Sequence, residues 1–229
     1  MWKARVFTLY PELFPGPLDN GLYKKAADKK IWSLDVINIR DYAEDKHKTV
    51  DDTPFGGGSG MVIKADVLAN SLDKNISDRN ETIIYLSPKG KKFDQSYAKQ
   101  IAAKNINIIC GHFEGVDERI LGTRNIEQIS VGDFVLSGGE IGALVIIDTI
   151  VRLISGVLGN SNSLAEETFE RNLLEYPQYT KPQKWEEKDV PNVLLTGDHA
   201  KIKDWRLSHS KDITRRRRSD LWKKHKKNK

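Results

Sequence analysis

The run Gly56–Gly60 (GGGSG) is the stretch whose residue types most directly suggest ligand binding. Glycine lets backbone N–H groups approach a phosphate closely. A P-loop, however, needs a Lys-Ser/Thr pair after its glycines, and a dinucleotide fingerprint needs a strand directly before them. Here the run follows the segment 51–54 (DDTP), and no such pair follows it. The pattern favours a loop that closes over a substrate, with a plain surface loop or a nucleotide site as the alternatives.

Cys110 is the only cysteine, and it is a candidate nucleophile only if a base lies beside it. His112 is the one basic residue close to it in sequence. The apolar run that precedes Cys110 favours a small buried residue at the end of a strand instead. The five histidines show no metal-ligand spacing, so we predict no metal site. A single cysteine excludes an internal disulfide and fits a cytoplasmic protein.

Arg152 and the carboxylates Glu166 and Glu167 could take part in proton or charge transfer. Arg152 is the only cation in the apolar run 140–154, and its structural interpretation is an ion pair with Asp148 one helical turn earlier. The two glutamates follow a glycine- and serine-rich stretch, where acidic residues are typical of the first turn of a helix. These residues alone leave the structural and catalytic interpretations open.

Strand and helix patterns alternate over the first 110 residues, which predicts an α/β domain with a largely parallel sheet. We expect strands at 2–10, 31–39, 82–86 and 106–110, helices at 22–30, 62–72 and 93–104, and a loop at 41–60. The apolar segment 140–154 is expected to form a helix that is buried on most faces, in the core or at a subunit contact.

Three loops are expected at strand ends, at 87–90 (SPKG), 111–115 (GHFEG) and 131–140 (VGDFVLSGGE). Ligands of open α/β sheets bind at the carboxyl ends of strands, so these loops could meet in one pocket.

The composition changes after the glycine- and serine-rich segment 155–163. We predict a first domain at 1–158, a flexible linker at 159–167 and a small helical domain at 168–229. The tail Lys211–Lys229 carries ten Lys/Arg against two Asp; it is therefore +8 in a chain of net charge +5, which leaves −3 for the rest. Such a tail favours a polyanion such as nucleic acid, or serves solubility alone. No apolar run approaches 18 residues and no signal peptide is evident, so we expect no membrane association.

Seven strings of the chain form a specific set. They are DDTPFGGGSGMV at 51–62, YLSPKGKKFDQ at 85–95, CGHFEGVDERI at 110–120, ISVGDFVLSGGE at 129–140, IVRLISGVLG at 150–159, LLEYPQYTKP at 173–182 and VLLTGDHAKIKDWR at 193–206. In this order and spacing they resemble the bacterial tRNA (guanine-N1)-methyltransferases of the SPOUT class, the TrmD family. The resemblance extends from Trp2 to about Leu221.

The resemblance implies a parallel α/β domain whose C-terminal part forms a trefoil knot, followed by a small all-helical domain that binds tRNA. It implies a homodimer with each active site between subunits, and transfer of a methyl group from S-adenosylmethionine to guanine N1 at tRNA position 37, next to the anticodon. The residues implied to contact S-adenosylmethionine are Tyr85, Leu86, Ser87, Gly111, Phe113, Glu114, Val131, Gly132, Asp133, Phe134, Val135, Leu136, Gly138 and Gly139. Asp52, Gly57 and Gly58 are implied to bind the substrate.

The resemblance also implies the two catalytic residues. The family places a carboxylate base after the linker and an arginine fifteen residues earlier, and the matching positions here are Glu167 and Arg152. A carboxylate can take the guanine N1 proton, and an arginine can stabilise the negative charge that grows on O6. Glu167-Thr168 stands where Asp-Ser is commoner, and Glu166 is the alternative base.

Smaller departures affect the loops. Phe55, Phe113 and Phe134 stand where tyrosine is common, while Thr53 and His112 stand where arginine is frequent. The family is reported to use Mg²⁺, but the sequence shows no carboxylate cage for it. The alternative functions are a non-catalytic RNA-binding protein that uses the basic tail, and an NTP-dependent enzyme that uses the glycine run.

Overall fold

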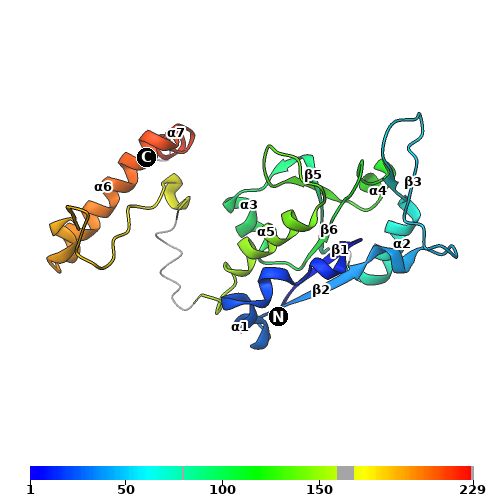
Figure 1. Ribbon diagram of the computed structural model, residues 1–229, viewed down its shortest axis with the longest axis horizontal. Coiled ribbons are helices and arrows are strands. Elements are labelled where there is room, and N and C mark those ends of the chain that lie inside the picture. Colours follow the sequence, from blue (N-terminus) through cyan, green and yellow to red (C-terminus); the bar gives the residue numbers. More distant parts are fainter. Residues whose placement is uncertain (79, 159–167, 228–229) are drawn as a thin grey trace. The chain divides into compact units, whose positions relative to one another are not determined.

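The computed structural model describes residues 1–78, 80–158 and 168–227 (Figure 1). The chain divides into two compact units, Met1–Gly159 and Asn160–Lys229. The expected linker 159–167, with Glu166 and Glu167 in it, lies outside the described residues. The assignment of the base therefore continues to depend on the sequence.

Five parallel strands form the central sheet of the first unit, in the order β2-β1-β6-β5-β7 (Figure 1). Their bounds are β1 Trp2–Thr8, β2 Trp32–Asn38, β5 Thr82–Lys92, β6 Ile106–Ile109 and β7 Glu127–Ser130. The predicted parallel α/β sheet is confirmed. Because β5, β6 and β7 are neighbours and run in the same direction, their carboxyl ends lie together at one edge of the sheet.

Apolar side chains fill both faces of this sheet. Ala4 and Val6 of β1 belong to one buried cluster, whereas Phe7 belongs to the other, as the two-residue repeat of a strand requires. The first cluster includes α1 (Gly21–Asp28), α3 (Gln95–Ile101) and α5 (Glu140–Val151), and the second includes α2 (Ala65–Asn75) and α4 (Glu118–Thr123). Because apolar side chains cover both faces of the sheet, a ligand can reach the sheet only at the ends of its strands.

Several expected boundaries are wrong, and two of them lie beside the strand-end loops. The helix predicted from Val62 begins at Ala65, because Val62–Ile63 form β4 and pair antiparallel with β3 (Asp51–Asp52), inside the expected loop. The strand predicted to end at Leu86 continues as β5 to Lys92. Leu86 and Lys91 both pair with Ile129 of β7, so residues 87–90 leave the ladder as a bulge. The segment SPKG is therefore an excursion within a strand rather than a strand end.

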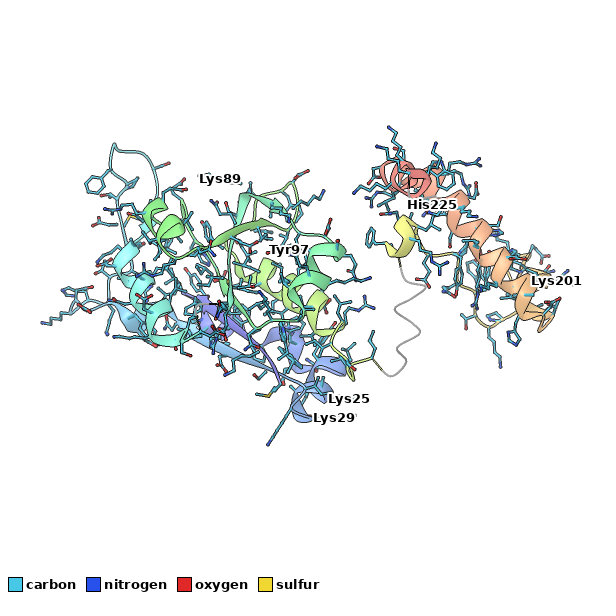
Figure 2. All side chains as sticks on the ribbon, turned by 180° about the vertical axis from the view of Figure 1, so that it is seen from behind. Lys25, Lys29, Lys89, Tyr97, Lys201 and His225 are labelled. Atoms are coloured by element: carbon cyan, nitrogen blue, oxygen red, sulfur yellow. The ribbon has the colours of Figure 1, made fainter. Side chains whose placement is uncertain are left out.

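The second unit contains α6 (His199–Arg217) and α7 (Ser219–Lys227). Figure 2 shows Lys201 on α6 and His225 on α7 toward opposite ends of this unit. Buried side chains connect the two helices to the residues before them. The Thr214 hydroxyl accepts a hydrogen bond from the Leu174 amide at 2.8 Å, and Nδ1 of His225 lies 2.8 Å from the Arg171 carbonyl oxygen.

The expectation of an all-helical second unit is wrong at a short hairpin of β8 (Lys184–Trp185) and β9 (Lys188–Asp189). Its turn residues Glu186 and Glu187 have φ values of 45° and 59°. Positive φ at both central positions is the type I′ geometry, which usually uses asparagine or glycine. With two glutamates at the turn, the sequence contains no hairpin signal.

A polar network lies at the amino ends of the strands. The Arg5 guanidinium lies 2.5 Å from Oε2 of Glu81, and the amides of Asn107 and Asn105 donate to the same carboxylate at 3.1 and 3.2 Å. Burial raises the pKa of Glu81, but the hydrogen bonds from Asn107 and Asn105 and the charge of Arg5 outweigh it, so the net pKa is lowered. The carboxylate therefore stabilises the fold above its ordinary pKa, and this contribution is lost as the pH falls through the lowered value.

We expect Glu81→Gln to lower the free energy of unfolding by about 1–3 kcal/mol near neutral pH, because Arg5 loses its charged partner. Urea denaturation would measure the loss, with Glu12→Gln, an exposed carboxylate, as the control. The difference between Glu81→Gln and the unchanged protein should shrink at acid pH. A difference that is constant with pH would show that the Glu81 charge is not what stabilises the fold.

Candidate active site

A bulge near the carboxyl end of β5 and the two segments that follow β6 and β7 line a cavity of about 300 Å³. They are the β5 bulge at 87–90, where Figure 2 labels Lys89, the segment 111–115 and the segment 131–139. The three segments that the sequence suggested for one pocket do line the same cavity. Its position agrees with the rule that open α/β sheets bind ligands at strand carboxyl ends.

Thirteen of the fourteen residues implied to contact S-adenosylmethionine line this cavity. They are Tyr85, Leu86, Ser87, Gly111, Phe113, Glu114, Val131, Gly132, Phe134, Val135, Leu136, Gly138 and Gly139. Asp133 is exposed in the same loop and is not among the lining residues. His112, Lys89 and Gln128 also line the cavity, although the resemblance did not assign them to the cofactor.

Where glycines line the cavity, its surface consists of backbone atoms. The Gly139 amide donates to the Gly111 carbonyl at 3.0 Å, which joins two of the three segments directly. A Cβ added at Gly139 would lie 2.6 Å from the Cα of Cys110, and one at Gly111 would lie 2.7 Å from the Tyr85 ring. The close approach therefore needs glycine at both positions, and it leaves no side chain on this part of the wall.

Cys110 has the buried structural role that the sequence favoured. Its side chain is fully buried at the end of β6. Burial first, and the Glu140 carboxylate second, raise the pKa of the Cys110 thiol well above its ordinary value. A thiol that stays protonated and inaccessible is not a nucleophile.

Glu140 is the buried carboxylate beside the cavity, with 2% of its surface exposed. The Thr8 hydroxyl donates to its Oε1 at 2.6 Å, and Nε2 of His112 lies 2.8 Å from its Oε2. This residue is not among the site residues predicted from the sequence. The only sequence signal for it is a carboxylate at the start of a helix that is apolar over most of its length.

The glycine-rich loop reaches the cavity at one end only. The Glu114 amide donates to the Met61 carbonyl at 3.0 Å, and a Cβ at Gly60 would lie 2.7 Å from Oε1 of Glu114. The loop therefore continues directly from the rim of the cavity. The resemblance implied Asp52, Gly57 and Gly58 for substrate binding. Asp52 is exposed in β3, Gly57 and Gly58 are exposed in this loop, and none of the three lines the cavity.

Arg152 follows the last residue of α5, one turn after Asp148. Burial raises the pKa of Asp148, and the positive charge of Arg152 partly offsets this, so the two expected partners interact. The Tyr23 hydroxyl also donates to Asp148. Glu140 begins α5 beside the cavity, and at 1.5 Å per residue the twelve residues to Arg152 span about 18 Å. The structure therefore does not bring Arg152 to the cavity of its own chain.

No group of three or more His, Cys, Asp or Glu side chains could hold a metal ion in the part of the chain that the structure describes. Within the same residues, no helix is both long and apolar enough to cross a membrane.

The sequence model of the family described as tRNA (Guanine-1)-methyltransferase TrmD matches residues 2–224. The chain belongs to this family. The match begins in β1 and ends within α7, so family membership covers both units. The resemblance drawn from the seven strings is confirmed.

Curated members of the family are similar to the chain over its whole length. The tRNA (guanine-N(1)-)-methyltransferase of Pelagibacter ubique (strain HTCC1062) is 66% identical over 229 residues, which is 100% of both chains. The protein of the same name from Bartonella tribocorum (strain CIP 105476 / IBS 506) is 51% identical over 99% of this chain and 97% of its own. That from Chelativorans sp. (strain BNC1) is 49% identical over 96% of this chain and 95% of its own.

Proposed function

We propose that this protein transfers the methyl group of S-adenosylmethionine to N1 of the guanine at tRNA position 37, next to the anticodon. The observation that carries the proposal is the cavity at the carboxyl ends of β5, β6 and β7. It is lined by thirteen of the residues that match the cofactor positions of the family. Its volume of about 300 Å³ is within the range of small-molecule sites.

The residues present suit the proposed methyl donor. The backbone around Gly111, Gly138 and Gly139 offers hydrogen-bonding groups to an adenine ring, and the Glu114 carboxylate at the rim offers a partner for an ammonium group. The donor supplies a methyl group on a positively charged sulfur, which leaves as a neutral thioether. The chain itself contributes orientation, because methyl transfer requires the nucleophile in line with the departing sulfur.

Two side chains complete the proposed reaction. Guanine N1 is a poor nucleophile while it carries its proton. In our proposal the Glu167 carboxylate accepts that proton as the N1–methyl bond forms and the sulfur–methyl bond breaks. The Arg152 guanidinium stabilises the negative charge that develops on O6. The products are N1-methylguanine in tRNA, S-adenosylhomocysteine and a protonated glutamate, which returns its proton to water.

We propose that each active site combines two subunits of a homodimer. The span of about 18 Å along α5 separates Arg152 from the cavity of its own chain. An apolar surface is available for the contact, because Ile141 and Val145, one turn apart on α5, are 58% and 47% exposed, and Phe134 and Val135 in the cavity loop are 55% and 85% exposed. Large apolar side chains that are exposed on a single chain are often covered at an interface. The family's trefoil knot is part of the proposal, supported by the membership of the chain in that family.

In our proposal the second unit binds tRNA. The last turn of α6 carries Arg215, Arg216 and Arg217, and α7 adds four lysines. Phosphate neutralisation by such residues gives affinity with little sequence specificity, so discrimination between bases is left to the cavity and the glycine-rich loop.

The test is transfer of labelled methyl from S-adenosylmethionine to two tRNA transcripts that differ only in guanine or adenine 3′ of the anticodon. We expect label in the guanine transcript alone, recovered as N1-methylguanine. Equal label in both transcripts would show that the guanine at position 37 is not the methylated base. Salt-sensitive tRNA binding by a folded protein that does not bind S-adenosylmethionine would favour the RNA-binding alternative.

A further inference from the structure

The buried Glu140 carboxylate connects strand β1 to the two glycine segments of the cavity, 111–115 and 131–139. Glu140 uses its two oxygens separately, Oε1 toward Thr8 at 2.6 Å and Oε2 toward His112 at 2.8 Å. The Glu140 side chain is 3% exposed and that of His112 is 13% exposed. None of the three residues is assigned a role in the reaction proposed above.

These contacts join parts of the chain that are far apart in sequence. Thr8 ends β1, His112 lies in the segment after β6, and Glu140 directly follows the segment after β7. Thr8 also accepts a hydrogen bond from the Tyr10 amide at 2.9 Å, and the Tyr10 ring packs on the His112 ring with centroids 4.6 Å apart. The network therefore fixes His112 from two sides.

The network lies directly beneath a residue that lines the cavity. His112 and Gly138 form an isolated backbone bridge between the two segments. A Cβ at Gly138 would lie 2.2 Å from Cε1 of His112 and 2.6 Å from Oε2 of Glu140. Gly138 thus rests against the hydrogen-bonded pair, and any movement of that pair changes the distance between segments 111–115 and 131–139.

The sheet itself does not need this network. The β1–β6 ladder runs from Ala4 to Phe7, and the Cys110 amide extends it by donating to the Phe7 carbonyl at 2.9 Å. Backbone hydrogen bonds therefore hold β1 and β6 together without the Thr8–Glu140–His112 network. Burying a carboxylate costs free energy of folding unless its hydrogen-bond partners compensate for the lost hydration. We therefore explain Glu140 by the two segments that it holds together rather than by a contribution to the stability of the fold.

We propose that Glu140, held by Thr8 and His112, is a positioning residue that sets the spacing of the two glycine segments and thereby the affinity for S-adenosylmethionine. The inference rests on the proposed function. An arginine at position 112 could take over the task of the histidine, since each can donate a hydrogen bond to the Glu140 carboxylate.

The experiment measures the dissociation constant for S-adenosylmethionine by calorimetry without tRNA, the KM for the donor and kcat, and the melting temperature. We expect His112→Ala and Glu140→Gln to raise the dissociation constant and KM by roughly 10–100-fold, as for a lost charge-assisted hydrogen bond, with a smaller change in kcat. His112→Arg should restore the affinity. His209→Ala, a half-buried histidine of the second unit, is the matched control and should bind the donor normally.

The outcomes separate the inference from the proposed function. If the unchanged protein does not bind S-adenosylmethionine, the proposed function fails. If the unchanged protein binds and folded His112→Ala binds equally well, the inference fails, and a lower melting temperature in that variant would make the network purely structural. Affinity that is lost in His112→Ala and not restored in His112→Arg would also overturn it, because the hydrogen bond would not be the cause.

Discussion

Replacement of Arg152 or Glu167 by alanine is expected to abolish methyl transfer while S-adenosylmethionine still binds. A general base typically contributes about 10²–10⁴-fold to a rate, and a fixed group that stabilises developing charge about 10²–10³-fold. Arg152 does not line the cavity of its own chain, and both residues are proposed to act on the guanine rather than on the donor, so the donor should bind both variants as it binds the unchanged protein. Single-turnover methylation of the guanine transcript, together with calorimetry, would measure both effects.

Neighbouring substitutions give the controls for this result. Glu166→Ala should retain activity if Glu167 is the base, and the reverse pattern would reassign the role to Glu166. Glu167→Asp shortens the side chain to the commoner family residue and should keep measurable activity, since a carboxylate remains. Full activity in both Arg152→Ala and Glu167→Ala would reject the roles proposed for them.

Mixed dimers extend the test to the shared active site. One chain would carry Arg152→Ala with Glu167→Ala, and the other a Gly111 substitution that blocks the cavity. Each is inactive alone. If the donor and the two catalytic side chains come from different subunits, the heterodimer retains one intact site and regains up to half of the activity per dimer. No recovery would show that at least one of the two catalytic side chains comes from the chain that supplies the cavity.

Four of the five strands of the sheet could be predicted from the sequence because their signals are local; β7 (Glu127–Ser130) is not among the predicted strands. Apolar runs with period-two burial, separated by helical patterns, recur through the first 110 residues, and the structure has β1, β2, β5 and β6 where those runs are. The two-residue strands β3 and β4 are too short to show a period. The helix α4 is six residues long and is not among the expected elements, because a single turn and a half gives little periodicity.

The candidate site could be predicted only in part, for a physical reason. Residues Tyr85, Gly111 and Gly139 are found from strings within each strand-end segment, and they do line one cavity. The Thr8–Glu140 hydrogen bond joins residues 132 positions apart, and no local pattern records a contact of that range. The separation of Arg152 from the cavity follows from the rise of α5, which needs the helix and the position of its first turn to be known together.

A series of three glycine-to-alanine variants should show that the methyl donor occupies the cavity, because the three positions differ in what the new methyl group meets. None of the three has positive φ, so space alone decides. At Gly139 the added Cβ would lie 2.6 Å from a backbone atom, the Cα of Cys110. At Gly132 it would meet the Phe134 ring at 2.3 Å, but that side chain is 55% exposed and can move. At Gly122, in α4, nothing lies within 4 Å.

We expect the affinity for S-adenosylmethionine to fall most in Gly139→Ala, by at least about tenfold, because backbone cannot yield without moving segments that line the cavity. Gly132→Ala should lose less, and Gly122→Ala should bind normally with equal or greater stability, since alanine favours a helix more than glycine does. Calorimetry on the three folded proteins would rank them. Equal affinity in all three variants would show that the donor binds elsewhere. A ligand in this cavity would be affected by the movement of backbone that the Gly139→Ala substitution requires.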